Sequence, residues 1–118
     1  MVTGLTGLAP FNGEPIEDAI VFVFSHALRR NVRKVCETAA MEIAHAYGLD
    51  HAIHCRDLMS YKRPCGRRRF LDEAIPCGEH HARPCKDGSP TQNSHRVLLE
   101  ALGPAPAEQG EAASVSSR

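Results

Sequence analysis

Hydrophobic and polar positions divide the chain into two amphipathic stretches separated by irregular sequence. The first extends from Val32 to Tyr47, where apolar residues recur three and four positions apart, as on one face of a helix. Asn31 precedes this stretch and is suited to cap it, and Gly48 follows it, where glycine adopts a positive φ at little cost. The apolar stripe, which we expect to pack under a sheet, comprises Val32, Val35, Cys36, Ala39, Ile43 and Tyr47.

A second helix is predicted near the C-terminus. Ser89 is placed to cap it, Pro90 to occupy its first position, and Gln92 to complete a capping box. Gly103 and the proline after it end the helix. Its apolar face consists of Val97, Leu98, Ala101 and Leu102.

One short strand is predicted before the first helix. Ala19–Phe24 is a continuous apolar run rich in β-branched and aromatic residues, which is the pattern of a strand buried on both faces. Residues 1–18 are interpreted as loop, and residues 52–88 as irregular structure held by cysteines. The strand therefore lacks an evident partner, and we expect poor solubility or a molten state for the isolated chain.

Composition limits the organisation to one small domain, which we assign to residues 1–103, followed by a tail at 104–118 with the composition of a disordered segment. Fourteen basic and fourteen acidic residues cancel, which argues against nucleic acid or an anionic membrane as partner. No apolar run reaches the ~18 residues of a membrane span. The basic cluster at 62–69 is therefore interpreted as a solvated loop face, with phosphate or an acidic partner as the alternative.

Candidate chemistry is concentrated at the end of the first predicted helix. Positions 41, 42 and 45 share one helix face, because side chains three and four apart are neighbours there. Gly48 turns the chain and can bring His51 back toward that face. Two imidazoles, from His45 and His51, and the carboxylate of Glu42 would then converge at a point where a zinc ion could bind.

The spacing E-x-x-H-x-x-G-x-x-H, followed by Met59-Ser60-Tyr61, resembles the metzincin zinc peptidases, and most closely their matrixin-like domains through Gly48-Leu49-Asp50-His51. The match covers roughly residues 36–61. The family has its first histidine ligand where this chain has Met41. A metzincin domain also carries a multistranded sheet before its active-site helix, so the resemblance implies an α+β domain that is truncated at its N-terminus, with a disulfide-rich irregular C-terminal part.

The resemblance implies a role for each matching residue. Glu42 corresponds to the general base, His45 and His51 to zinc ligands, and Met59 to the methionine of the turn beneath the metal. Tyr61 corresponds to a tyrosine that stabilises the oxyanion. The ancestral reaction is hydrolysis of a peptide or protein substrate by a zinc-bound water. Each of these residues also has an ordinary structural interpretation. Glu42 would be an exposed helix glutamate, the two histidines would bind no metal, Met59 would fill the core and Tyr61 would serve only in packing.

Met41 changes this expectation. A thioether is a poor replacement for imidazole on zinc. We therefore expect binding of the Zn²⁺ cofactor to be weak or absent and hydrolysis to be impaired or lost. His54, three residues after His51, is an alternative ligand, but nothing in the spacing places it at the site, and we prefer to interpret it as a solvated loop histidine.

Five cysteines in a short chain indicate an oxidising compartment, and the family resemblance also favours an extracellular location, although the N-terminus has no signal-peptide pattern. Disulfides Cys55–Cys65 and Cys77–Cys85 would close short local loops and leave Cys36 over. Alternatively, the C-x₂-H and H-x₃-C spacings between Cys77 and Cys85 suit a structural zinc site. The competing function is thus a non-enzymatic Cys/His-rich module for zinc binding or interaction.

Overall fold

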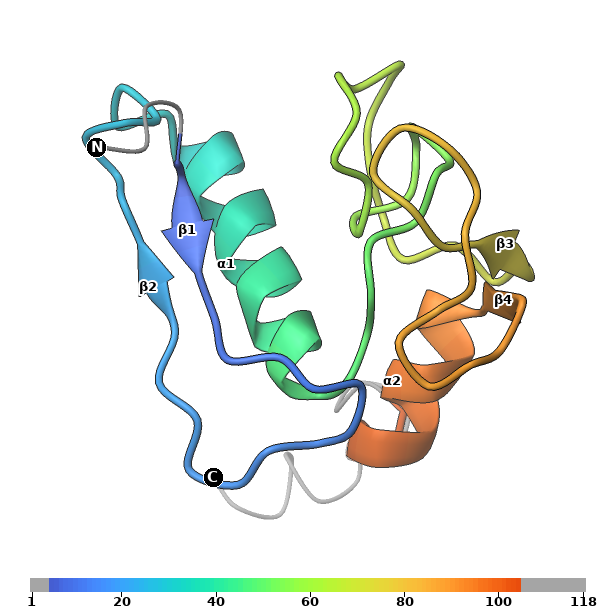
Figure 1. Ribbon diagram of the computed structural model, residues 1–118. Helices are drawn as coiled ribbons and strands as arrows, with labels where there is room; N and C mark the ends of the chain where they lie inside the picture. Colours follow the sequence, from blue (N-terminus) through green and yellow to red (C-terminus); the bar gives the residue numbers. More distant parts are fainter. Residues whose placement is uncertain (1–4, 105–118) are drawn as a thin grey trace, which may run out of the picture.

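Residues 5–104, which the computed structural model describes, form an α+β fold with two helices and two pairs of short antiparallel strands (Figure 1). Predictions for the tail fall, apart from Pro104, outside these residues. No helix in this part of the chain is both long and apolar enough to cross a membrane. In chain order the elements are β1 Gly7–Leu8, β2 Phe22–Val23, α1 Val32–Ala46, β3 Ile75–Pro76, β4 Thr91–Gln92 and α2 Ser94–Leu102.

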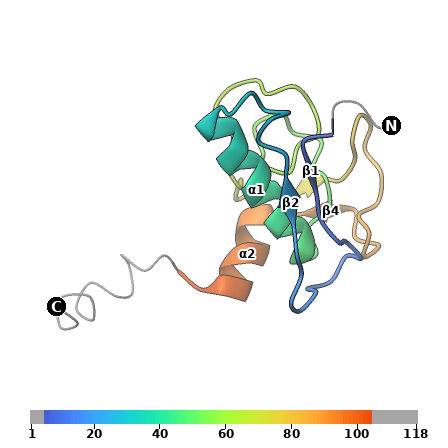
Figure 2. The ribbon, with the colours of Figure 1, turned by 90° about the vertical axis from the view of Figure 1, so that its left-hand side faces the viewer.

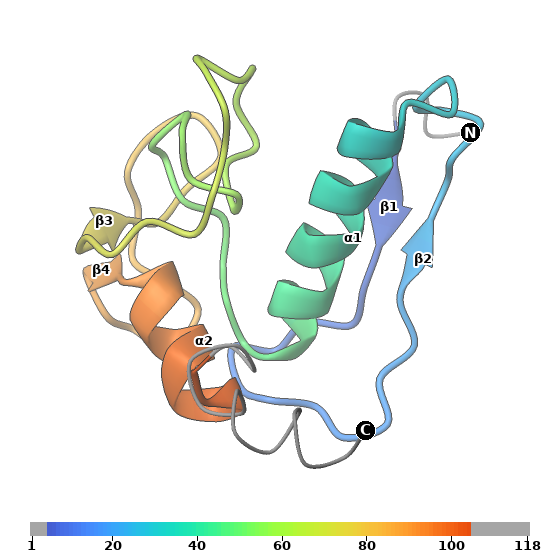
Figure 3. The same ribbon diagram turned by 180° about the vertical axis from the view of Figure 1, so that it is seen from behind.

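Helix α1 separates the two halves of the fold. Strands β1 and β2 lie along one side of it, and Figure 2 shows them in front of the helix. The segment after α1 lies on the other side, where β3 pairs with β4 and α2 follows directly (Figure 3). The helix is therefore the element on which both halves are placed.

The strand predicted at Ala19–Phe24 is corrected in three respects. Only Phe22–Val23 forms a strand, and it pairs with β1, which lies in the segment predicted to be loop. Side chains along 19–24 alternate between half-buried and exposed, because only one face of this strand meets α1 and no second layer covers the other face within residues 5–104. The expectation of poor solubility was based on an unpaired strand, and that premise is wrong.

Helix α1 begins as predicted and ends one residue earlier, with Tyr47 as its C-cap. The side chain of Asn31 accepts a hydrogen bond from the Lys34 backbone N–H at 3.1 Å. The buried face was predicted wrongly, however. Val32 is 76% exposed and Ile43 is 47% exposed. The residues that are buried are Glu42, Ala44, His45 and Ala46, near the C-terminal end of the helix, where β1 covers Glu42 and the C-terminal half covers Ala44.

Helix α2 begins later than predicted, because Thr91–Gln92 pairs with β3 instead of starting the helix. Asn93 is the N-cap and accepts a hydrogen bond from the Arg96 backbone N–H at 2.8 Å. The Gln92 amide, predicted to complete a capping box, bonds instead to the backbone N–H and C=O of Asp50. The helix ends at Leu102, before Gly103, as predicted.

A small core lies between α1 and the C-terminal half and consists of Ala44, Leu49, Ala52, Met59 and Ile75. Beside it, the fully buried Asp57 carboxylate accepts hydrogen bonds from the backbone N–H of Met59 and the hydroxyl of Ser94. Disulfides Cys55–Cys65 and Cys77–Cys85 are present and Cys36 is free, which confirms the predicted pairing. The irregular region thus has a core as well as its disulfides.

Two matched truncations test which face of α1 is buried. We expect Met59→Ala to lower the free energy of unfolding by about 3 kcal/mol, because it empties a fully buried site. Ile43→Ala should cost less than about 1 kcal/mol, because Ile43 is half exposed. Urea denaturation followed by circular dichroism measures both. Equal losses would show that the Ile43 stripe is buried after all.

Candidate functional site

His45 and His51 meet beside the C-terminal end of α1. His45 lies in the last turn of the helix, and Gly48 reverses the chain after it with φ 100°. This turn brings His51 back so that the Nε2 atoms of the two imidazoles are 3.2 Å apart. The rings stand nearly perpendicular, with centroids 4.6 Å apart. The convergence predicted from spacing is therefore present in the structure.

The other nitrogen of each ring is held by an oxygen. Nδ1 of His45 is 2.7 Å from the backbone oxygen of Leu49, and Nδ1 of His51 is 2.8 Å from the carboxylate of Glu79. Because both oxygens act as acceptors, each Nδ1 carries the proton and donates it. Burial lowers the pKa of His45, and the proximity of His51 lowers it further, which favours a neutral imidazole. The two Nε2 atoms face one another within hydrogen-bonding distance.

This pair of nitrogens fits a metal ion. A cation between the two Nε2 atoms, either a proton or a metal ion, would bind both. With Zn–N bonds of 2.0–2.1 Å, two ligands of a tetrahedral site lie about 3.3–3.4 Å apart, close to the separation found here. An oxygen acceptor on the second ring nitrogen is also the usual support for a metal-binding histidine. The separation and orientation of the two nitrogens are therefore compatible with a shared metal ion.

Glu42 lies on the same face of α1, three residues before His45. Its side chain is largely buried, with 8% of the residue exposed, and no group within residues 5–104 donates a hydrogen bond to its carboxylate. Burial raises the pKa of Glu42, and the charge of His51 opposes this effect. Strand β1 passes directly over it, since a Cβ at Gly7 would lie 2.6 Å from a Glu42 carboxylate oxygen. The carboxylate is thus available as a proton acceptor.

The remaining predicted site residues surround the histidines. Met41 is half-buried, packs against the core and lines the same cleft as Glu42. Met59 is fully buried in the core, a place that an ordinary core methionine would share. Tyr61 is 61% exposed, and its ring edge approaches the ring of His51 with centroids 5.4 Å apart.

The alternative ligands are directed elsewhere. Nδ1 of His54 accepts a hydrogen bond from the backbone N–H of Arg56 within its own exposed loop. Cys77 and Cys85 are joined by a disulfide, so neither sulfur is a thiolate available to a metal. Neither His54 nor this cysteine pair therefore completes the site.

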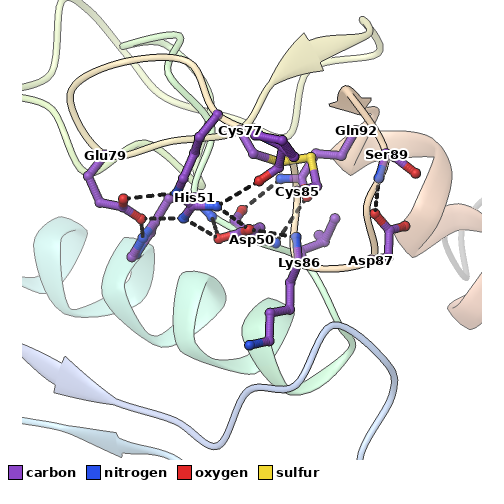
Figure 4. The surroundings of a disulfide bond; sticks show 12 residues. Asp50, His51, Cys77, Glu79, Cys85, Lys86, Asp87, Ser89 and Gln92 are labelled. Atoms are coloured by element: carbon purple, nitrogen blue, oxygen red, sulfur yellow. Dashed lines mark hydrogen bonds and ion pairs between the residues drawn. A yellow bond between two sulfur atoms is a disulfide. The ribbon is translucent and has the colours of Figure 1, made fainter.

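Sequence reasoning missed an ion-pair network behind His51. The guanidinium of Arg83 donates to both carboxylate oxygens of Asp50, at 2.7 and 2.9 Å, and to both of Glu79, at 2.6 and 3.2 Å. Asp50 also accepts from the backbone N–H of His51. In Figure 4, Asp50, His51 and Glu79 lie side by side next to the Cys77–Cys85 disulfide. Glu79 had no distinguishing signal, because only the folded 77–85 loop brings it to His51.

Asp50, His51 and Glu79 also form a cluster whose potential ligand atoms lie within 4.8 Å of one another. Hydrogen bonds from Arg83 hold the pKa of Glu79 at about 2. Burial acts to raise the pKa of Asp50, but the bonds from Arg83 and from backbone N–H groups outweigh it and lower that pKa. The single positive charge of Arg83 is shared between these two carboxylates, and both also contact His51, at its backbone N–H and at its Nδ1.

The histidine pair lies in a cleft of about 940 Å³ between α1, the β1 strand and the loop at 60–68. Phe11, from the segment after β1, packs against the ring of His45 with centroids 5.3 Å apart. The chain matches no protein-family model, no curated protein and no solved structure. The geometry and chemistry of this site therefore provide the basis for assigning a function.

Arg83 should be the most important charged side chain for stability. Replacing it by glutamine leaves the Asp50 carboxylate, of which 4% is exposed, without its strongest partner. We expect Arg83→Gln to lower the free energy of unfolding by about 2 kcal/mol. Arg96→Gln is the control, since the Arg96–Asp72 pair is largely exposed and should contribute less than about 0.5 kcal/mol. Equal effects in denaturant titrations would contradict a structural role for Arg83.

The low pKa of Glu79 predicts a dependence of stability on pH. Because the pKa in the folded protein, about 2, lies below the ordinary value of 4.5, this carboxylate stabilises the fold above about pH 4.5, and the contribution is lost as the pH falls toward 2. The effect should be modest, because the side chain is 36% exposed. Urea denaturation across this range should show a steeper loss for the native sequence than for Glu79→Gln. Parallel losses would argue against it.

Proposed function

We propose that this chain is a zinc-binding domain related to the metzincin, matrixin-like peptidases, with peptide hydrolysis impaired or lost through Met41. His45 and His51 hold the metal, and Glu42 occupies the place of the general base. The observation that supports this most is the pair of Nε2 atoms 3.2 Å apart, each on a ring whose Nδ1 donates to an oxygen. The two imidazole nitrogens are thereby directed at one another, at a separation that suits two ligands of one zinc ion.

Zinc bound between the histidines would act as a Lewis acid that polarises a carbonyl group and lowers the pKa of water. The chain itself supplies two imidazole nitrogen donors, oriented by Leu49 and Glu79. Glu42 would accept a proton from water in the cleft, and its raised pKa suits a group that later returns that proton. A peptide substrate would lie in the cleft, where the hydroxyl of Tyr61 could donate to its carbonyl oxygen.

Met41 makes the donor set incomplete. Catalytic zinc sites in proteins have three protein ligands, and here only two imidazoles converge. The Met41 side chain stands one helical turn before His45 and lines the cleft, so it holds the place of the third donor without supplying a suitable atom. We therefore infer weak zinc binding and little or no hydrolysis.

The setting of the protein fits the same proposal. Two disulfides in a small domain are typical of an oxidising environment, which agrees with an extracellular protein. The competing proposal of a Cys/His-rich structural zinc module loses its main ligands, because Cys77 and Cys85 are bonded to each other. The part of this competing proposal that remains is a non-enzymatic interaction domain. That is compatible with a domain that is related to peptidases but no longer hydrolyses peptides.

Restoring the third imidazole tests the assignment. We expect Met41→His to raise zinc affinity by more than ~10-fold, because a direct ligand outweighs the supporting groups whose loss has effects of that size. Competition with a chromophoric chelator measures the affinity, and Met41→Leu, which adds no donor, should leave it unchanged. Met41→His with Glu42→Gln should bind zinc but cleave no peptide. Unchanged affinity in a folded Met41→His chain would reject the metal site.

A further inference from the structure

The charges of the chain are unevenly distributed. Basic and acidic residues balance at fourteen each, yet the cleft beside the histidines has six basic and two acidic side chains in its walls. The acidic residues are Glu37 and Glu42. The basic ones are Arg33, Lys34, Lys62, Arg63, Arg67 and Arg68.

Most of these positive charges have no partner. Of these six side chains, only Arg68 forms an ion pair within residues 5–104, with Glu37 at 3.5 Å. Arg68 also donates a hydrogen bond to the backbone oxygen of Ser60. The other five basic side chains form no ion pair in that part of the structure. Cations gathered on the walls of a cleft create a positive potential that attracts an anionic ligand.

Arg33 and Lys34 lie toward the end of the cleft opposite His45, whereas Lys62 directly follows Tyr61, whose ring contacts that of His51. Arg33 and Lys34 belong to the first turn of α1 and His45 to its last, which at 1.5 Å per residue separates them by about 17 Å. The Arg68–Glu37 pair ties the 62–68 loop to the same half of the helix. Figures 1 and 3 show this loop, in yellow-green, level with the start of α1.

We propose that the cleft binds an extended acidic peptide whose carboxylates lie over this basic end. At about 3.3 Å per residue, the carboxylates would stand about five residues from the segment lying at His45 and His51. This proposal names a ligand class for the cleft described under the proposed function. It rests on that function only for the five-residue spacing between the carboxylates and the segment at the histidines. The binding itself needs no metal.

A peptide fits the cleft better than a nucleic acid does. The walls include the aliphatic side chains of Leu5, Leu8 and Met41, which can receive apolar side chains of a peptide. Only two aromatic rings apart from the histidines, Phe11 and Tyr61, line it within the described residues. Single-stranded nucleic acids depend on successive aromatic platforms for stacking, and this cleft does not provide such a series.

The test uses the full chain with a chelator present and fluorescence anisotropy of labelled peptides. A peptide with a run of glutamates should bind at least about tenfold tighter than the same peptide with lysines, and salt should weaken it. Lys62→Glu with Arg67→Glu should reduce its affinity at least about tenfold, because two attractions become repulsions. Lys86→Glu with Arg96→Glu, which makes the same charge change outside the cleft, should change it less than about twofold.

Three results would overturn the proposal. They are equal affinity for the glutamate and lysine peptides, equal losses in the cleft and control variants, and binding of an oligothymidylate as tightly as the acidic peptide. If charge reversal disturbs folding, Lys62→Gln with Arg67→Gln should give an intermediate loss of affinity. Because zinc is excluded, failure of acidic binding leaves the metal assignment intact, and failure of the zinc titration leaves acidic binding intact.

Discussion

The position of His51 depends on one guanidinium group. Arg83 holds the carboxylates of Asp50 and Glu79 together, and these approach His51 from two sides, through its backbone N–H and through its ring nitrogen. The Cys77–Cys85 disulfide closes the loop that carries both Glu79 and Arg83. Without this network the His51 ring would lose the hydrogen bond that fixes its Nδ1, and its Nε2 atom would be held less firmly opposite that of His45.

The other half of the site is placed by the helix. Helix α1 carries Glu42 and His45 on its buried face, and β1 covers that face so closely that Gly7 has no space for a side chain. A carboxylate and an imidazole thus take positions that aliphatic residues would ordinarily fill. The hydrophobic core beside them is small, and the disulfides and ion pairs provide much of the remaining constraint on the C-terminal half.

The cleft combines two kinds of chemistry along one helix. Its histidine end presents two imidazole nitrogens and a carboxylate, which suit a cation. Its other end presents unpaired positive charges, which suit an anionic segment of a ligand. About three turns of α1 separate the two ends, so one extended chain could contact both.

Features determined by the sequence alone involve residues close together in the chain. They include the cap at Asn31, the turn at Gly48, the approach of His45 to His51 across six residues, and the disulfides across ten and eight. Helical periodicity and chain reach are enough to predict contacts of this kind.

The tertiary structure alone decided the rest. The buried face of α1, the partner of β2 and the start of α2 depend on which segments pack together, and Glu79 reaches His51 across 28 residues and Arg83 reaches Asp50 across 33. Contacts at that separation form only when the whole chain has packed, so no local sequence pattern predicts them.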